Sequence, residues 1–109
     1  MALRASIIKP HLTKLFMPTP TNPLLMFGGT ECVHCHEMDP FVQQLEKEEG
    51  IKIEYLESWH NEENAKLLEQ YDQGRCGGVP FFFNTKTQKF ICGSCDYETL
   101  KKWAKSANE

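Results

Sequence analysis

A short apolar run directly before two cysteines constrains this chain most. Residues 24–27 read Leu-Leu-Met-Phe between a proline and two glycines, which is typical of a buried β-strand. Apolar residues at spacings of three and four then follow over residues 35–49, a pattern that predicts a helix ending at Gly50. Cys32 and Cys35 therefore lie where a buried strand gives way to a helix.

A cysteine at a helix N-terminus is a candidate nucleophile. Unpaired backbone N–H groups and the helix dipole favour negative charge there, so the pKa of Cys32 should be lowered. A thiol of pKa about 8.5 is only about 3% ionised at pH 7, whereas one of pKa about 6 is roughly 90% ionised. His34, between the two cysteines, would stabilise the thiolate as an imidazolium and make the disulfide a stronger oxidant. The alternative for His34 is a solvated loop histidine.

Length and charge favour one small domain. A chain of 109 residues with 40% hydrophobic content can bury one modest core. The net charge of −3 is too small to indicate nucleic acid or an anionic membrane, and no apolar run approaches the roughly 18 residues of a spanning helix. We expect a monomer with a single domain over residues 1–109, its core within 24–107, and neither a membrane span nor a nucleic-acid partner.

The first 23 residues allow two interpretations. Residues 6–9 could form a first strand and residues 12–17 a short helix, before a proline-rich connector. The same segment holds Arg, Ser and Thr without acids, as an organelle targeting extension would. No secretory signal is visible, so a cytoplasmic, plastid or mitochondrial location is expected in preference to secretion.

The rest of the sequence predicts alternating strands and helices. Residues 51–56 combine alternation with β-branched side chains, as a strand does, and Asn61 can cap the helix that follows. Residues 81–83 and 89–92 predict a β-hairpin whose three phenylalanines belong in the core, and Asp96 can cap a last helix. With the N-terminal pair included, the predicted order is β-α-β-α-β-α-β-β-α.

This combination resembles the thioredoxin fold family over nearly the whole chain. The likeness rests on a strand, Cys32-x-x-Cys35, a helix with an internal proline, a Gly-Val-Pro loop, a hairpin and Gly93. It implies an α/β three-layer sandwich with a mixed central sheet of four to five strands flanked by helices. It also implies a cis peptide bond before Pro80, pairing of the Val79 backbone with a bound substrate segment, and an approach of the last strand to the active site at Gly93.

The active-site sequence departs from an ordinary thioredoxin. Trp-Cys-Gly-Pro-Cys is replaced by Glu-Cys-Val-His-Cys, which is closer to disulfide isomerases and periplasmic disulfide oxidases. Thioredoxins place a buried aspartate six residues before the first cysteine, as proton acceptor for the second, and Met26 stands there in this chain. Deprotonation of Cys35 then needs another proton acceptor. His36 or a water is a candidate, although the preferred interpretation of His36 is a helix-surface histidine.

We therefore predict a thiol–disulfide oxidoreductase that exchanges disulfides with proteins and is more oxidising than thioredoxin. Cys32 forms a mixed disulfide with the substrate, and a mostly buried Cys35 resolves it. The redox-active disulfide needs no further cofactor. An unidentified reductase or oxidase would recycle the Cys32–Cys35 pair. The sequence does not indicate the direction of electron flow.

Three further cysteines leave alternatives open. Cys92 and Cys95 would most simply be small buried residues at a strand end and a helix start. They could instead form an auxiliary disulfide that relays electrons, with Cys76 taking part. A third possibility is a zinc or iron–sulfur site built from Cys32, Cys35, Cys92 and Cys95. A non-catalytic adaptor of the same fold is the remaining function class, but an adaptor has no need of both thiols beside the predicted cis-proline.

Overall fold

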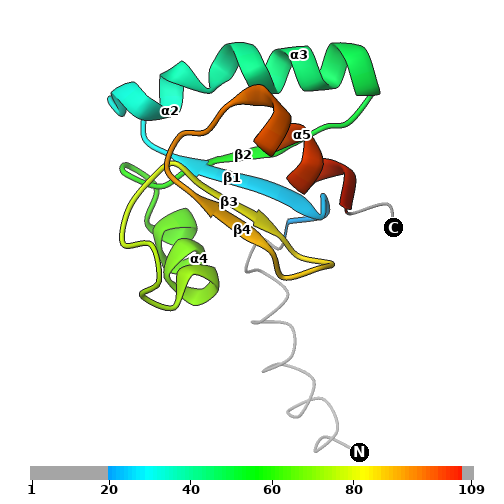
Figure 1. The fold of residues 1–109 in the computed structure, drawn as a ribbon. Coiled ribbons are helices and arrows are strands. Elements are labelled where there is room, and N and C mark those ends of the chain that lie inside the picture. Colours follow the sequence, from blue (N-terminus) through cyan, green and yellow to red (C-terminus); the bar gives the residue numbers. More distant parts are fainter. Residues whose placement is uncertain (1–19, 107–109) are drawn as a thin grey trace, which may run out of the picture.

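The computed structural model describes residues 20–106. Its elements are, in order, β1 (Leu24–Gly28), α2 (Val33–Glu37), α3 (Asp39–Glu49), β2 (Glu54–Glu57), α4 (Glu62–Asp72), β3 (Phe81–Asn84), β4 (Phe90–Cys92) and α5 (Tyr97–Lys105) (Figure 1). The strand predicted at residues 6–9 and the helix predicted at 12–17 lie outside the described residues. Among residues 20–106, no helix is long and apolar enough to cross a membrane.

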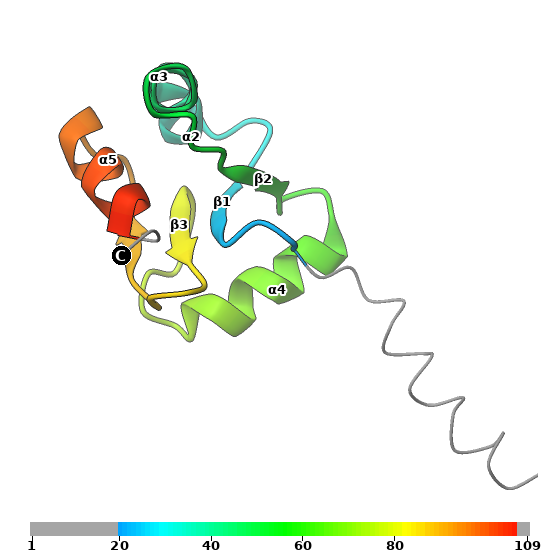
Figure 2. The ribbon, with the colours of Figure 1, turned by 90° about the vertical axis from the view of Figure 1, so that its right-hand side faces the viewer.

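A mixed four-stranded sheet forms the middle layer. Its strand order is β2-β1-β3-β4, with β1 parallel to β2, and with β3 antiparallel to both β1 and β4. Helices α2, α3 and α5 lie on one side of the sheet and α4 lies on the other (Figure 2). This is the three-layer α/β arrangement that the sequence predicts, with the two central strands covered on both sides.

Each face of the sheet carries its own apolar cluster. All five residues of β1 are buried, as predicted, and because successive side chains of a strand point to opposite faces, they serve both clusters. Met26 and Phe82 pack with Leu45, Leu100 and Trp103 on the α3 and α5 side. The cluster on the α4 side contains Leu25, Phe27, Phe81 and Phe83, with Leu67, Leu68 and Tyr71 packed against it. The three phenylalanines of β3 are thus core residues, as predicted.

Helix capping follows the sequence closely. Asn61 Oδ1 accepts a hydrogen bond from the backbone N–H of Asn64 at 3.0 Å and begins α4. Asp96 Oδ1 accepts one from the backbone N–H of Thr99 at 2.8 Å and begins α5. Each bond satisfies an N–H group that has no partner within its helix, which is why both caps could be predicted from residue type alone.

The helix predicted over residues 35–49 is divided in two. One helix, α2, ends at Glu37, Met38 caps both pieces, and Pro40 lies in the first turn of α3. Proline has no N–H group to donate to the preceding turn, so a continuous helix would lose a hydrogen bond there. In the first turn of a new helix that N–H group would be unpaired in any case, so the break at Met38 accommodates the proline.

Candidate active site

Cys32 and Cys35 form a disulfide at the start of α2. Their Cα atoms are 5.2 Å apart, which is within the usual range for a disulfide. Cys32 is the N-cap residue, and its sulfur accepts a hydrogen bond from the backbone N–H of Cys35 at 3.1 Å. After reduction the same N–H group would face a Cys32 thiolate, which favours the charged form. Cys35 is only 2% exposed, in keeping with the predicted buried partner.

The loop before β3 reaches the disulfide from the opposite side. The peptide bond between Val79 and Pro80 is cis, and the Val79 carbonyl oxygen lies 3.9 Å from the Cys32 sulfur. Gly93 donates its backbone N–H to the Pro80 carbonyl oxygen at 2.8 Å. The structure therefore brings together Cys32, Val79, Pro80 and Gly93, which the sequence spreads over 62 positions. Substrate pairing at Val79 stays a prediction.

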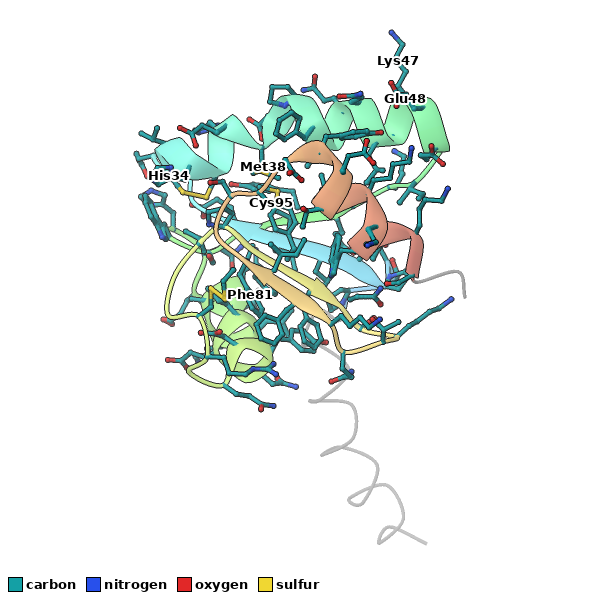
Figure 3. All side chains as sticks on the ribbon, in the orientation of Figure 1. His34, Met38, Lys47, Glu48, Phe81 and Cys95 are labelled. Atoms are coloured by element: carbon teal, nitrogen blue, oxygen red, sulfur yellow. A yellow bond between two sulfur atoms is a disulfide. The ribbon has the colours of Figure 1, made fainter. Side chains whose placement is uncertain are left out.

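The imidazole of His34 is exposed and has Glu37 as its partner. Its side chain is 71% exposed, and Nδ1 is 3.1 Å from Glu37 Oε1, three residues further along the chain. Figure 3 shows His34 at the outer end of α2. The ring thus has a carboxylate partner on its own helix, at an i,i+3 spacing where side chains meet. Stabilisation of a Cys32 thiolate by the His34 imidazolium stays a prediction.

His36 fastens the loop that precedes the disulfide. Its Nε2 is 2.6 Å from the Thr30 carbonyl oxygen, and its Nδ1 is 3.1 Å from Asp39 Oδ2. The hydrogen bond to Thr30 raises the pKa of His36, and the Asp39 carboxylate raises it further. A protonated imidazole can donate at both nitrogens at once, so this geometry suits the charged form. His36 is thus an exposed helix residue, in line with the preferred interpretation. Each of its ring nitrogens also has a partner, the Thr30 carbonyl or the Asp39 carboxylate.

A second set of contacts holds the same loop from β2. Glu57 Oε2 accepts hydrogen bonds from the backbone N–H and the hydroxyl of Thr30, at 3.1 and 3.2 Å. Its other oxygen accepts the backbone N–H of His60 at 2.9 Å. Burial pushes the pKa of Glu57 upward, but the hydrogen bonds from His60 and Thr30 outweigh it and the pKa is lowered. Charged Glu57 therefore ties the active-site loop to the sheet.

Tyr55 lies beside Cys35, which the sequence interpretation missed. A Cβ placed on Gly28 would lie 3.0 Å from the Tyr55 hydroxyl oxygen and 3.3 Å from the Cys35 sulfur. A pocket of about 320 Å³ opens next to them, lined by Thr30, Cys35, His36, Asp39 and Tyr55. The signal for Tyr55 was the alternation of residues 51–56, but its neighbour depends on how β2 is aligned with β1.

The three remaining cysteines agree only in part with the interpretations offered for them: Cys95 packs as a partly buried residue at a helix start, whereas Cys92 does not behave as expected. Cys92 is paired with Cys76, with Cα atoms 5.6 Å apart, and not with Cys95. Cys92 is exposed and is therefore not a buried apolar residue. Cys95 is a free cysteine that packs against the α3 and α5 cluster, and burial raises the pKa of its thiol. Cys76 packs on the α4 side, so the sheet separates it from the cluster that contains Cys32.

The alternative metal site is not assembled. Within residues 20–106, no three His, Cys, Asp or Glu side chains are grouped closely enough to hold a metal ion. Two of the four proposed thiolate ligands, Cys32 and Cys35, are joined to each other, and Cys92 is joined to Cys76. Sulfurs in disulfides are not available as thiolate ligands, and the four do not converge on one point.

Comparisons with known proteins support the fold. The chain matches no protein-family model and no curated protein sequence. Among solved structures, it is similar to the crystal structure of the glutaredoxin from Archaeoglobus fulgidus, with 25% sequence identity and a TM-score of 0.57. The match covers 75% of this chain and 85% of that one. The chain thus has a thioredoxin-like fold, and this fold carries a Cys-x-x-Cys disulfide.

Proposed function

We propose that this protein is a thiol–disulfide oxidoreductase acting on protein substrates through Cys32 and Cys35. The observation that carries the proposal is the disulfide at the start of α2, with its Cys32 sulfur 3.9 Å from the Val79 carbonyl oxygen. An extended substrate segment that pairs with the backbone at Val79 would bring its own sulfur close to Cys32. The name of the similar archaeal structure, a glutaredoxin, points to the same class of activity.

The exchange proceeds in two steps that conserve atoms and electrons. The Cys32 thiolate attacks one sulfur of a substrate disulfide; a mixed disulfide forms, and the other substrate sulfur leaves as a thiolate. Cys35 then loses its proton and attacks the Cys32 sulfur, which closes the Cys32–Cys35 disulfide and releases the second substrate thiolate. The substrate gains two electrons and the enzyme loses two. In the opposite direction the same steps oxidise a substrate dithiol.

The proposal includes a redox potential above that of thioredoxin. The Cys35 backbone N–H that bonds the Cys32 sulfur would stabilise the reduced dithiol as a thiolate, and this makes the disulfide a stronger oxidant. We expect His34 to raise the potential less than the sequence indicates, because its Nδ1 is 3.1 Å from the Glu37 carboxylate. We expect a midpoint above about −270 mV, the thioredoxin value, in glutathione buffers read by thiol alkylation. A midpoint at or below that value would contradict this part of the proposal.

Insulin reduction distinguishes the enzyme from an adaptor of the same fold. The wild-type protein should reduce insulin disulfides in the presence of a dithiol reductant, and Cys32→Ser should abolish the reaction. Cys95→Ser is the matched control, since Cys95 forms no disulfide, and it should retain activity. If the wild-type protein and Cys32→Ser react at the same rate as the reductant alone, the proposed activity is wrong.

A further inference from the structure

Cys35 has to carry a negative charge in a buried position. It is a thiolate when it attacks the mixed disulfide, and it leaves as a thiolate when the disulfide is opened. A buried charge is costly unless a neighbouring group donates a hydrogen bond to it. The strand beneath offers Met26, which is 2% exposed and whose thioether has no proton to donate. A neighbouring side chain with a proton to donate would stabilise the charged sulfur.

The strand alignment identifies that side chain. The parallel pairing of β1 with β2 places Tyr55 opposite Met26. Directly paired residues on neighbouring strands point to the same face, and residues two apart on a strand do so as well. Ile53 packs against the cluster that contains Met26 and Cys35, so Tyr55 points to the cysteine side of the sheet.

Gly28 leaves open the space between the Tyr55 hydroxyl and the Cys35 sulfur. A Cβ at this position would be 2.8 Å from the Tyr55 ring and 3.3 Å from the Cys35 sulfur, closer than side chains normally approach the ring. Because glycine has no Cβ, the hydroxyl of Tyr55 and the sulfur of Cys35 border one small volume. The adjacent pocket, which both residues line, gives water access to that volume.

The surrounding charges keep the Tyr55 hydroxyl protonated. Burial raises its pKa, and the carboxylates of Glu57 and Asp39 raise it further. Glu57 lies on the same strand, whereas Asp39 faces the pocket from α3 with the imidazole of His36 bound to it. The hydroxyl therefore keeps its proton where thiols titrate and is available as a hydrogen-bond donor.

We propose that the Tyr55 hydroxyl donates a hydrogen bond to the Cys35 thiolate and so stabilises the charged sulfur during exchange. This inference rests on the proposed thiol–disulfide activity. When Cys35 ionises, its proton passes to water in the pocket, and the sulfur lone pair forms the new bond to Cys32. The bond from Cys32 to the substrate sulfur breaks, and that sulfur leaves with the electron pair. Tyr55 acts equally in the reverse step, in which Cys35 is the leaving thiolate.

Tyr55→Phe tests the role of the hydroxyl, because it retains the ring over Gly28. In a Cys32→Ser background, the pKa of Cys35 is followed by the NMR shift of its Cβ. A hydrogen bond to a charged group corresponds to about one to two pKa units, so the pKa of Cys35 should rise by that amount in Tyr55→Phe. With Cys32 present, substrate release from a preformed mixed disulfide should slow several-fold at pH 7, because the gain in thiolate nucleophilicity only partly offsets the smaller thiolate fraction.

Tyr97→Phe is the matched control. It removes a hydroxyl that bonds Glu48 at 3.0 Å between α3 and α5, and it should leave the pKa of Cys35 unchanged. If Tyr55→Phe also leaves that pKa and the release rate unchanged, the proposal is overturned, even if the variant is less stable. Failure of the proposed activity has a different signature, since the wild-type protein itself would then release no substrate.

Discussion

Gly29 shows how a single residue shapes the active-site loop. A Cβ at this position would lie 2.2 to 2.6 Å from three atoms of the Trp59 indole, closer than real Cβ atoms come. Only glycine at position 29 lets the indole pack so closely on this loop. Gly29 lies three residues before Cys32 in the sequence. The exposed tryptophan is thus a packing partner of the loop, and Gly29 is required by close approach alone.

Gly29→Ala should destabilise the fold by about 1–3 kcal/mol, the usual cost of an overpacked contact. The clash includes the indole Cγ, so the whole ring has to move. Gly78→Ala is the matched control, because nothing lies within 4 Å of its Cβ position and its φ is not in the left-handed region. Urea unfolding measures both variants, and equal losses of unfolding free energy would contradict the assigned contact.

The protonation of His36 makes stability depend on pH. Its pKa is raised in the folded protein, chiefly by the hydrogen bond to the Thr30 carbonyl and then by Asp39. A raised pKa means that the folded state binds the proton more tightly than the unfolded state does. This contribution to stability is therefore fully present below the ordinary value of 6.5 and is lost as the pH rises through the folded-state pKa.

An NMR titration of the His36 ring should accordingly give a pKa above 6.5, and Asp39→Asn should lower it. The pKa of His60 provides an internal comparison, because the carboxylate that raises it most belongs to Glu31 and is untouched by that change. A His36 pKa that stays the same in Asp39→Asn would show that the ring and the carboxylate do not interact in solution.

Two histidine–carboxylate pairs could have been predicted from the sequence. His34 and Glu37, like His36 and Asp39, are three residues apart around one helix start, a spacing at which side chains meet. Interpreting His34 from its place between the cysteines overlooked this competing partner. The position of Tyr55 could not be derived in the same way, because it depends on the pairing of strands about 30 positions apart.

At the scale of elements, the loop between α4 and β3 depends on one buried carboxylate. Asp72 ends α4, is 6% exposed, and accepts the backbone N–H groups of Cys76 and Gly77 at 2.7 and 2.9 Å. Arg75 bonds back to the Asp72 carbonyl, and its guanidinium lies 4.2 Å from the Phe90 ring centroid. These contacts order the loop that carries Val79 toward the disulfide.

Asp72→Asn should therefore cost about 1–3 kcal/mol of unfolding free energy, because an amide keeps one acceptor oxygen and presents its NH₂ group to the other backbone N–H. Glu69→Gln makes the same chemical change at an exposed position of α4 and should be close to neutral. The two variants are compared by urea denaturation. A cost for Asp72→Asn no larger than that for Glu69→Gln would rule out a structural role for these hydrogen bonds.

The elements themselves were largely predictable, and the reasons are local. A wholly apolar run marks β1, and the caps Asn61 and Asp96 satisfy helix N–H groups within three residues. The internal proline indicated a kinked or broken helix but not that the break falls at Met38, and the pairing of Cys76 with Cys92 was not foreseen. The second of these depends on where a loop lies relative to β4, which no local pattern specifies.

In the whole molecule, the sheet organises the chemistry. The disulfide of Cys32 and Cys35 belongs to the apolar cluster on the α3 and α5 side, whereas Cys76 packs on the α4 side. The loop with Val79 contacts both clusters and reaches the Cys32 sulfur. This arrangement supports the proposal of one redox pair, Cys32 and Cys35, with a backbone docking position at Val79, and it gives no direct support to a relay between the two disulfides.

Trapping the mixed disulfide tests the central claim most directly. Cys35→Ser retains the Cys32 sulfur and removes the resolving thiol, so a reduced protein of this variant should accumulate a covalent complex with a peptide disulfide. Mass spectrometry of the digested complex should place the bond at Cys32, and Cys32→Ser should form no such complex. Absence of a complex in Cys35→Ser, or a bond located at Cys95, would contradict the account.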